Sequence, residues 1–307
     1  MLDTLSIPAA PRLAATLRAR IDRIDRIAPL DDTAAFRFTL LMTLLLVLLY
    51  SPSQSYVKAP ASVLALAALF HPPLARDSRL WLLFTGLLAT ACYHTWYTVD
   101  NHKVLLVYWC ATLFLAFEAR DPQGALASAA RRLIGLVFAL ATAAKLWAPD
   151  FLTGDFFTYT LLSDDRFTRV TPLLGLDAAS ARANEVALDA LRAMDSSLGE
   201  VVLAVPPQLA SLALAMTAWT ILIEGAVALA FLWPLDRGPS RLRDPLLLAF
   251  VASTYLLAPV TGFGWVLLAM GMAQSSPSRP RLRMAYLAAF LLLQAYHFPW
   301  TSLTPGL

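Results

Sequence analysis

Residues 208–235, QLASLALAMTAWTILIEGAVALAFLWPL, decide the fold class, because this stretch carries a single charged side chain, Glu224. A helix needs about 20 predominantly apolar residues to cross a hydrocarbon core about 30 Å thick. The stretch is longer than that. We therefore predict a transmembrane helix here, with Glu224 near its middle.

The apolar character extends over the whole chain of 307 residues. Hydrophobic residues make up 58% and charged residues 15%, and the mean hydropathy is +0.61. Soluble domains are about 45–50% apolar and about 25% charged. Further apolar runs lie at about 34–50, 57–70, 79–98, 103–118, 127–148 and 284–298. The sequence predicts an all-α, polytopic transmembrane helical bundle of about seven to nine membrane segments.

The region 245–274 is long enough for one tilted span, but Pro259, Gly262 and Gly264 interrupt it. Such breaks favour a re-entrant segment or hairpin of two short helices. A hairpin also places the arginines of 279–283 on the same side as those of the other short loops. Because basic loops stay in the cytoplasm, we expect a multi-pass protein of a bacterial inner membrane whose C-terminus is extracytoplasmic. The net charge of +3 then reflects topology and not a nucleic-acid site.

The segment 1–33 lacks the apolar core of a secretory signal. Arginines alternate with Leu and Ile at helical spacing, which predicts a cytoplasmic, interfacial amphipathic helix. The rest, 34–307, forms a single membrane domain. Its one long polar segment, 149–206, is rich in acids and is predicted to be an extracytoplasmic loop. The bilayer is the first predicted partner.

The residues that could take part in acid–base chemistry lie near the outer ends of the predicted spans. The turn Asp100-Asn101-His102-Lys103 joins two spans, Lys145 ends another on the same side, and His94 and Asp150 are near. An imidazole, a carboxylate and a lysine at a desolvated membrane edge can supply general acid–base chemistry. The alternative is that Lys145 snorkels to the interface and His102 caps a helix.

Glu224 lies where an ionisable group costs about 2.5–3.5 kcal/mol on insertion scales. It should face the bundle interior, either in catalysis or as a buried acid bonded to another helix. No metal-ligand spacing is present. Cys92 and Cys110 are interpreted as buried small hydrophobes or, alternatively, as a redox pair.

Aromatic side chains cluster near the same predicted outer edge. They form either an interfacial belt or a quinone-binding box. The residues are Tyr93, Trp96, Tyr97, Tyr108 and Trp109.

In their order along the chain, three segments resemble the HTTM domain, the membrane domain shared by vitamin K-dependent gamma-carboxylases and many bacterial proteins. The first is Asp100–Leu105, with its Asn-His pair; the second is Ala144–Gly154, with a Lys-Leu pair, an acid, an aromatic and a glycine. The third runs from Glu224 to Arg237, and Phe36-Arg37-Phe38 is a weaker match.

The resemblance implies that Lys145 acts as the base that deprotonates a vitamin K-like hydroquinone, with His102 beside it and Glu224 in support. Asn101, Asp100, His94 and Asp150 would then help to bind the substrate. A quinone-type lipid would be the cofactor or substrate. The carboxylases carry polar residues and a histidine after the intramembrane acid, whereas 246–258 offers only Ser253, Thr254 and Tyr255. The large extracytoplasmic domain of the carboxylases is also missing. Gamma-glutamyl carboxylation itself is therefore not expected.

Whether the chain is an enzyme remains open at this point. The first hypothesis is quinone-linked base chemistry at an extracytoplasmic site. The second is a non-enzymatic membrane maturation or assembly factor that presents 149–206 to a secreted peptide or protein. A transporter is the third, suggested by the broken region 245–274.

Overall fold

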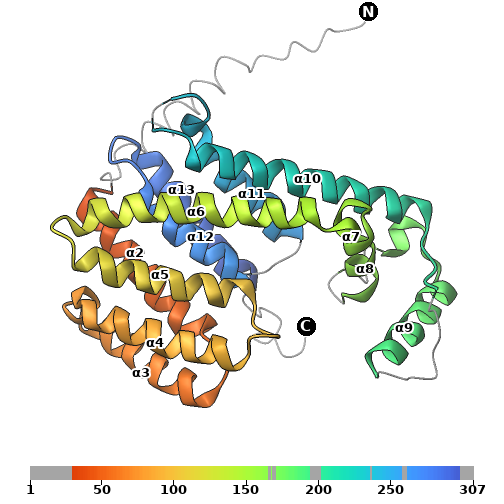
Figure 1. Cartoon of the computed structure of the whole chain (residues 1–307), viewed down its shortest axis with the longest axis horizontal. Coiled ribbons are helices and arrows are strands. Elements are labelled where there is room, and N and C mark those ends of the chain that lie inside the picture. The colour runs from red at the N-terminus through yellow and green to blue at the C-terminus, as the bar shows by residue number, and fades with distance from the viewer. Residues whose placement is uncertain are drawn as a thin grey trace, which may run out of the picture.

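The structure, a computed structural model, describes residues 30–164, 167, 171–193, 202–235, 237–257 and 261–297. Regular structure within them is entirely helical, with 12 α-helices (Figure 1). The all-α prediction is confirmed. The predicted amphipathic helix falls almost wholly outside the described residues, and so does the C-terminus.

The bundle consists of α2 (Asp32–Tyr50), α3 (Ser55–Phe70), α4 (Ser78–His94), α5 (Asn101–Phe117), α6 (Pro122–Trp147), α10 (Pro207–Leu232), α11 (Arg243–Leu257), α12 (Thr261–Gln274) and α13 (Pro280–His297). Three further helices stand between α6 and α10: α7 (Pro149–Leu152), α8 (Asp155–Ser163) and α9 (Ala178–Arg192). Short 3-10 helices are η1 (Leu74–Arg76), η3 (Thr171–Leu174) and η4 (Gly238–Leu242).

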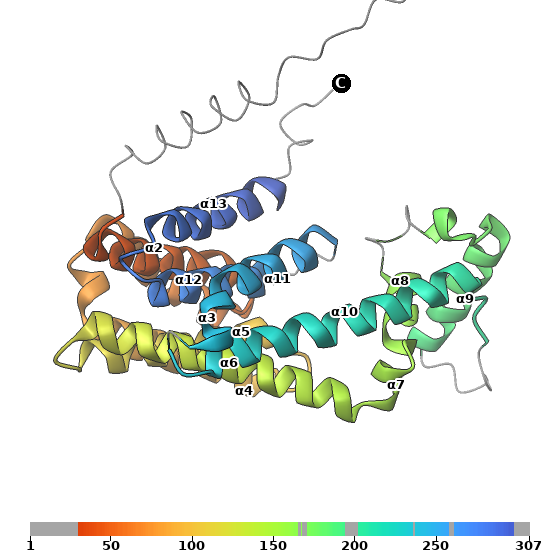
Figure 2. The same cartoon turned by 90° about the horizontal axis from the view of Figure 1, so that it is seen from above.

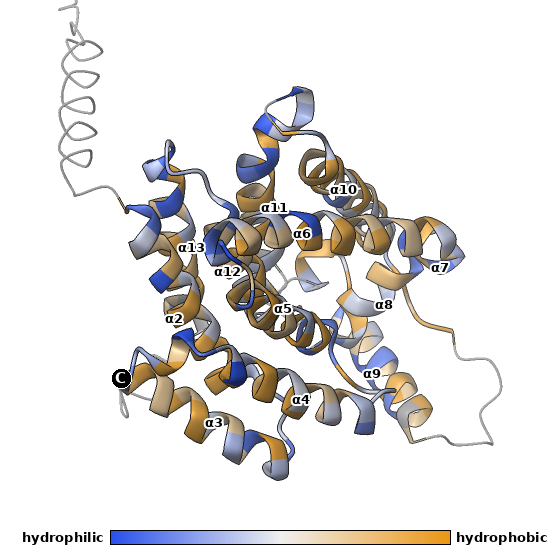
Figure 3. Cartoon of the chain, turned by 60° about the vertical axis from the view of Figure 1, so that its left-hand side comes forward, coloured by the Kyte–Doolittle hydropathy of each residue, from blue (hydrophilic) through white to orange (hydrophobic). Residues whose placement is uncertain are grey.

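Among the described residues, α2, α6 and α10 are long and apolar enough to cross a membrane. They hold 19, 26 and 26 residues. The chain thus has the helices of an integral membrane protein. The predicted seven to nine segments are not confirmed, because other apolar helices, such as α3 and α5, have only 16 and 17 residues. Hydrophobic residues cover long stretches of the bundle helices, while hydrophilic ones gather mainly near their ends and in α9 (Figure 3).

Helix α12 lies at the centre and packs against α2, α5, α6 and α13 (Figure 2). The five residues 266–270 are all 0% exposed. A helix that is apolar on every side lies in a protein core or in a membrane, and α12 is surrounded by other helices. The predicted pair of short helices in 245–274 is confirmed as α11 and α12.

One end of the bundle collects the arginine-bearing turns and is named the arginine end. There Arg283 of α13 pairs with Asp32 of α2 at 2.6 Å, and Arg243 of α11 donates to Gln274 of α12 at 2.9 Å. The start of α6 and the end of α10 lie at the same end (Figure 1). The shared placement of these basic turns agrees with the hairpin argument.

The segment 149–206 was predicted to be a loop, but its described part is largely helical. Helices α7, α8 and α9 form a lobe that projects beyond the opposite end of the bundle (Figures 1 and 2). Asp177 caps α9 by accepting from the backbone N–H groups of Ala179 and Ser180, both at 3.0 Å. The hydrogen bond from the Ser180 hydroxyl is the largest cause that holds the pKa of Asp177 below its usual value, and the two backbone N–H groups add to it.

Four of the five aromatic residues that were predicted to form a belt or a box lie on the surface. Tyr93, Trp96, Tyr97 and Tyr108 are 60–97% exposed. Trp109 was wrongly included, since it is fully buried and donates its indole N–H to Thr43 at 2.9 Å. The alternation of helix faces explains the difference, because adjacent residues such as 108 and 109 point in different directions. Both cysteines are buried and free, which agrees with the interpretation as small hydrophobes.

Candidate functional site

Lys145 lies in the last turn of α6, where its charge is favoured by the negative end of the helix dipole. Its Nζ donates to Oε2 of Glu224 at 2.7 Å and lies 5.6 Å from the centre of the Phe151 ring. The side chain is 23% exposed. Lys145 therefore points into the protein and does not snorkel to the membrane surface.

Glu224 meets Lys145 because α6 and α10 are antiparallel and offset. Helix α10 begins out beside the lobe, so Glu224 lies about 26 Å along it. That distance brings its carboxylate level with the end of α6. Glu224 is only 7% exposed, and a charge so placed requires a partner.

The turn before α5 carries the remaining polar residues of the site. Asp100 precedes the helix and pairs with Lys103 at 2.8 Å, and this hydrogen bond lowers the pKa of Asp100. Asn101 and His102 occupy the first turn of α5. The His102 ring meets the Tyr50 ring edge-on with centroids 6.3 Å apart.

These groups share one cavity of about 440 Å3, which we name the Lys145 cavity. Small-molecule sites are typically about 300–1,000 Å3 and mostly apolar, with a few convergent polar groups. Its polar lining is Asp100, Asn101, His102, Lys145, Glu224, Thr254 and Tyr255. Its apolar lining is Val99, Val137, Phe138, Ala141, Phe250 and Phe263.

Much of this polar lining is unengaged. Within the part of the chain that the structure describes, the side chains of His102, Thr254 and Tyr255 form no hydrogen bond, and only one carboxylate oxygen of Glu224 accepts one. Polar groups on a half-buried wall are normally satisfied by protein, water or ligand. The cavity therefore offers both donors and acceptors to a molecule that enters it.

Gly262, at the start of α12, sets the position of His102. A Cβ added there would lie 2.5 Å from Cδ2 and 2.8 Å from Nε2 of that imidazole. Only glycine allows the ring to lie against the α12 backbone. The glycine that predicted a helix break thus also creates room at the site.

Two predicted site residues lie elsewhere. His94, in the last turn of α4, contacts the rings of Tyr56 and Tyr93, at 6.1 and 5.8 Å between centroids. Asp150 is exposed in the first turn of α7. Neither lines the cavity, because the ends of α4 and α7 lie beyond its walls.

Thr254 and Tyr255 were missed as site residues. In the sequence they are among the few polar residues of 246–258, a region that is less polar than its counterpart in the carboxylases. In the structure α11 turns both toward the cavity. Their position next to the break at 259–264 was the available signal, since a broken membrane helix is tolerated where it lines a cavity.

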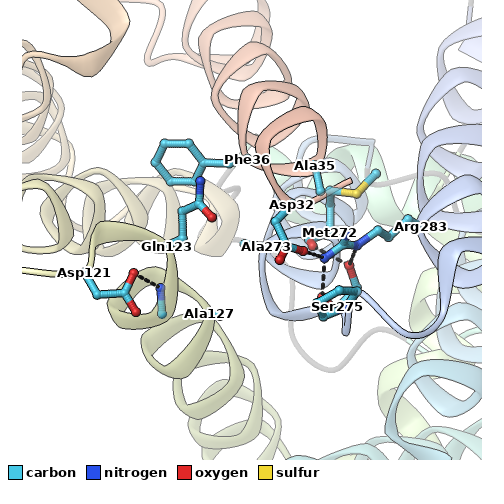
Figure 4. Close-up of a pocket in the computed structure, with 12 residues that line it drawn as sticks. Asp32, Ala35, Phe36, Asp121, Gln123, Ala127, Met272, Ala273, Ser275 and Arg283 are labelled. Carbon is cyan, nitrogen blue, oxygen red and sulfur yellow. Dashed lines mark hydrogen bonds and ion pairs between the residues drawn. The ribbon is translucent and has the colours of Figure 1, made fainter. Parts of the chain in front are cut away.

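A second pocket, of about 280 Å3, lies at the arginine end between the starts of α2, α6 and α13 (Figure 4). Arg283, only 3% exposed, donates there to Asp32 and to the carbonyls of Leu30 and Ser275. With the bond from Nε to the Ser275 hydroxyl, four of the five N–H groups of this guanidinium have an acceptor. This arginine, predicted to be a loop charge, ties α13 to α2.

Comparisons of the chain with models of protein families, with curated proteins and with solved structures find no match.

Proposed function

We propose that the Lys145 cavity is the site of base chemistry on a lipophilic substrate with an acidic hydroxyl, of the quinol type. The observation that carries the proposal is the Lys145–Glu224 pair on the wall of an otherwise aromatic and aliphatic cavity. Phe138, Phe250 and Phe263 offer flat apolar surfaces to a ring. The resemblance of Asn101-His102 and Lys145 to the HTTM membrane domain supports the same substrate class.

Lys145 and Glu224 are held together at 2.7 Å, and this pair can accept one proton from a substrate hydroxyl. The product is the Lys145 ammonium beside a protonated Glu224. The remaining positive charge then faces the substrate oxyanion, which is the electrostatic stabilisation that such a step needs. His102 and Tyr255 lie on the same walls and orient the second oxygen of the substrate.

The proposed location is a bacterial inner membrane, with the arginine end in the cytoplasm and the cavity facing outward. The arginines Arg243 and Arg283 at one end of the bundle support this orientation. The lobe would then be extracytoplasmic. A lipid-soluble substrate reaches such a site from within the bilayer.

The test begins with the protein purified in detergent. We expect a quinone to copurify and to be identified by mass spectrometry of an organic extract. The purified chain should also bind added menadiol, a soluble naphthoquinol, measured by quenching of tryptophan fluorescence. Lys145→Met should remove menadiol binding, because the proton acceptor and the charge are both lost.

Lys58→Met is the matched control. Lys58 is a second partly buried lysine with one hydrogen bond, to the carbonyl of Leu48 at 2.6 Å, and it does not line the cavity. This variant should bind menadiol normally. Absence of any bound quinone, together with full complementation in vivo by Lys145→Met, would rule out the proposed chemistry.

A second candidate function, a maturation or assembly factor for a secreted peptide or protein, is supported by the lobe. Val186 of α9, with Leu173 of η3 and Val202 before α10, is among the exposed apolar residues of this region, at 63–85% exposure. Contiguous patches of such residues commonly mark interaction surfaces. Replacing 171–193 with a Gly-Ser linker should abolish this function while membrane insertion, followed by fractionation, persists. Unchanged function in that variant would exclude the lobe as the binding surface.

A further inference from the structure

A groove of about 690 Å3 lies between α2, the end of α3 and η1, and it shares no lining residue with the Lys145 cavity. Pro72 and Pro73 end α3, and the turn leaves the groove open. Its wall on α2 is formed by Leu40, Leu41 and Leu44. Leu69 of α3 faces them across the groove.

Two arginines complete the lining, Arg37 of α2 and Arg76 of η1. Both are exposed. Within the described residues neither forms an ion pair, and no acidic side chain lines the groove. Two like charges that share an unneutralised groove attract an anion, and guanidinium groups match phosphate oxygens particularly well.

The charges and the apolar wall are aligned along the helix. Residues 37, 40, 41 and 44 have the spacing of one α-helical face. The stripe begins with a cation near the helix start and continues for about 10 Å into the apolar part of α2. A ligand that follows it needs a negative head and a hydrocarbon tail.

We propose that this groove binds one anionic membrane phospholipid, with its phosphate between Arg37 and Arg76 and an acyl chain along Leu40, Leu41 and Leu44. Basic pockets between membrane helices recognise anionic lipid headgroups in this way. A soluble phosphate would leave the leucine wall unused. The site is separate from the Lys145 cavity and stands without the proposed chemistry there.

The experiment is native mass spectrometry of the full chain in detergent with added dioleoyl phosphatidylglycerol or dioleoyl phosphatidylcholine. One basic side chain near a membrane surface contributes about fivefold in affinity. We therefore expect one bound phosphatidylglycerol, preferred about 25-fold over phosphatidylcholine. The double variant Arg37→Ala/Arg76→Ala should lose this preference, and Leu41→Trp, which fills the groove, should weaken binding of both lipids.

Arg79→Ala is the matched control, since Arg79 follows η1 closely but does not line the groove. It should bind like the parent. Thermal unfolding of all variants should remain near that of the parent, because both groove arginines are exposed. Equal binding of the two lipids would overturn the proposal, and so would displacement of the lipid by soluble glycerol phosphate. A dimer of the parent chain that dissociates in the Arg37→Ala/Arg76→Ala variant would also overturn it, because the groove would then bind a second copy of the chain.

Discussion

Two buried carboxylates, Asp244 at the arginine end and Glu224 at the Lys145 cavity, have opposite surroundings. Asp244 is 1% exposed, and its Oδ1 accepts from Gln274 at 2.6 Å and from Tyr286 at 2.9 Å. Glu224 accepts only from Lys145, beside open space. The first carboxylate joins helices that are already in contact, whereas the second leaves bonding capacity facing a cavity.

A buried charged group can thus either join helices, as Asp244 does, or face a cavity, as Glu224 does. Ionisable residues are expensive in either place. At Asp244 two hydrogen bonds to Oδ1 and two arginines within 4 Å of Oδ2 offset that cost. At Glu224 one carboxylate oxygen is left to water or a ligand, as the proposed proton exchange requires.

Asp244→Ala gives the largest expected effect. It removes the acceptor of the Tyr286 hydroxyl and one acceptor of the Gln274 amide, together with the ion-pair partner of two arginines. Removal of one member of a buried network costs about 3–5 kcal/mol. Lys145→Met should cost about 1–2 kcal/mol, because Glu224 can take up a proton and contact cavity water. Thermal unfolding in detergent measures both. Equal losses of stability in the two variants would contradict the difference between Asp244, which is bonded within the protein, and Glu224, which faces a cavity.

Substitution of two glycines of α12 should distinguish the two ends of the bundle by smaller changes in stability. A Cβ at Gly271 would collide with the ring of Tyr286, which is fully buried. Gly271→Ala should therefore cost about 1–3 kcal/mol through overpacking. In Gly262→Ala the half-buried His102 can turn into the cavity, so stability should fall by less than about 1 kcal/mol.

Menadiol binding should show the reverse order, with a loss in Gly262→Ala and little change in Gly271→Ala. Gly86→Ala is the control, since nothing lies within 4 Å of its added Cβ. That variant should gain up to about 1 kcal/mol from helix propensity. Normal binding by Gly262→Ala would show that His102 does not shape the cavity.

The smallest expected effect concerns pH at the cavity edge. The hydrogen bond from Lys103 lowers the pKa of Asp100, so the stabilisation is fully present above the ordinary aspartate pKa and is lost as the pH falls through the lowered value. Because Asp100 is 56% exposed, the effect should be a few tenths of a kcal/mol. Asp100→Asn should unfold at a slightly lower temperature than the parent at neutral pH, and the difference should vanish in acid. A difference that persists in acid would assign it to another cause.

Much of the site could be predicted because topology alone brings helix ends together. Counting spans placed Asn101-His102 and Lys145 on one face, and the structure puts them around one cavity. The meeting of Lys145 and Glu224 could not be predicted. It depends on the offset between α6 and α10, which in turn depends on α10 starting beside the lobe.

Local pattern by itself determined membrane character, the helical class and the positions of most helices, since apolar length and Pro/Gly breaks act within a few turns. Which charged residues are bonded within the protein and which remain available depends on the packing of distant helices. Arg283 and Arg37 look alike in the sequence, both near the start of an apolar helix. Arg283 donates to Leu30 before α2, to Asp32 of α2 and to the α12–α13 turn, whereas Arg37 faces an open groove. That difference arises from contacts between residues up to 253 positions apart, which no local pattern encodes.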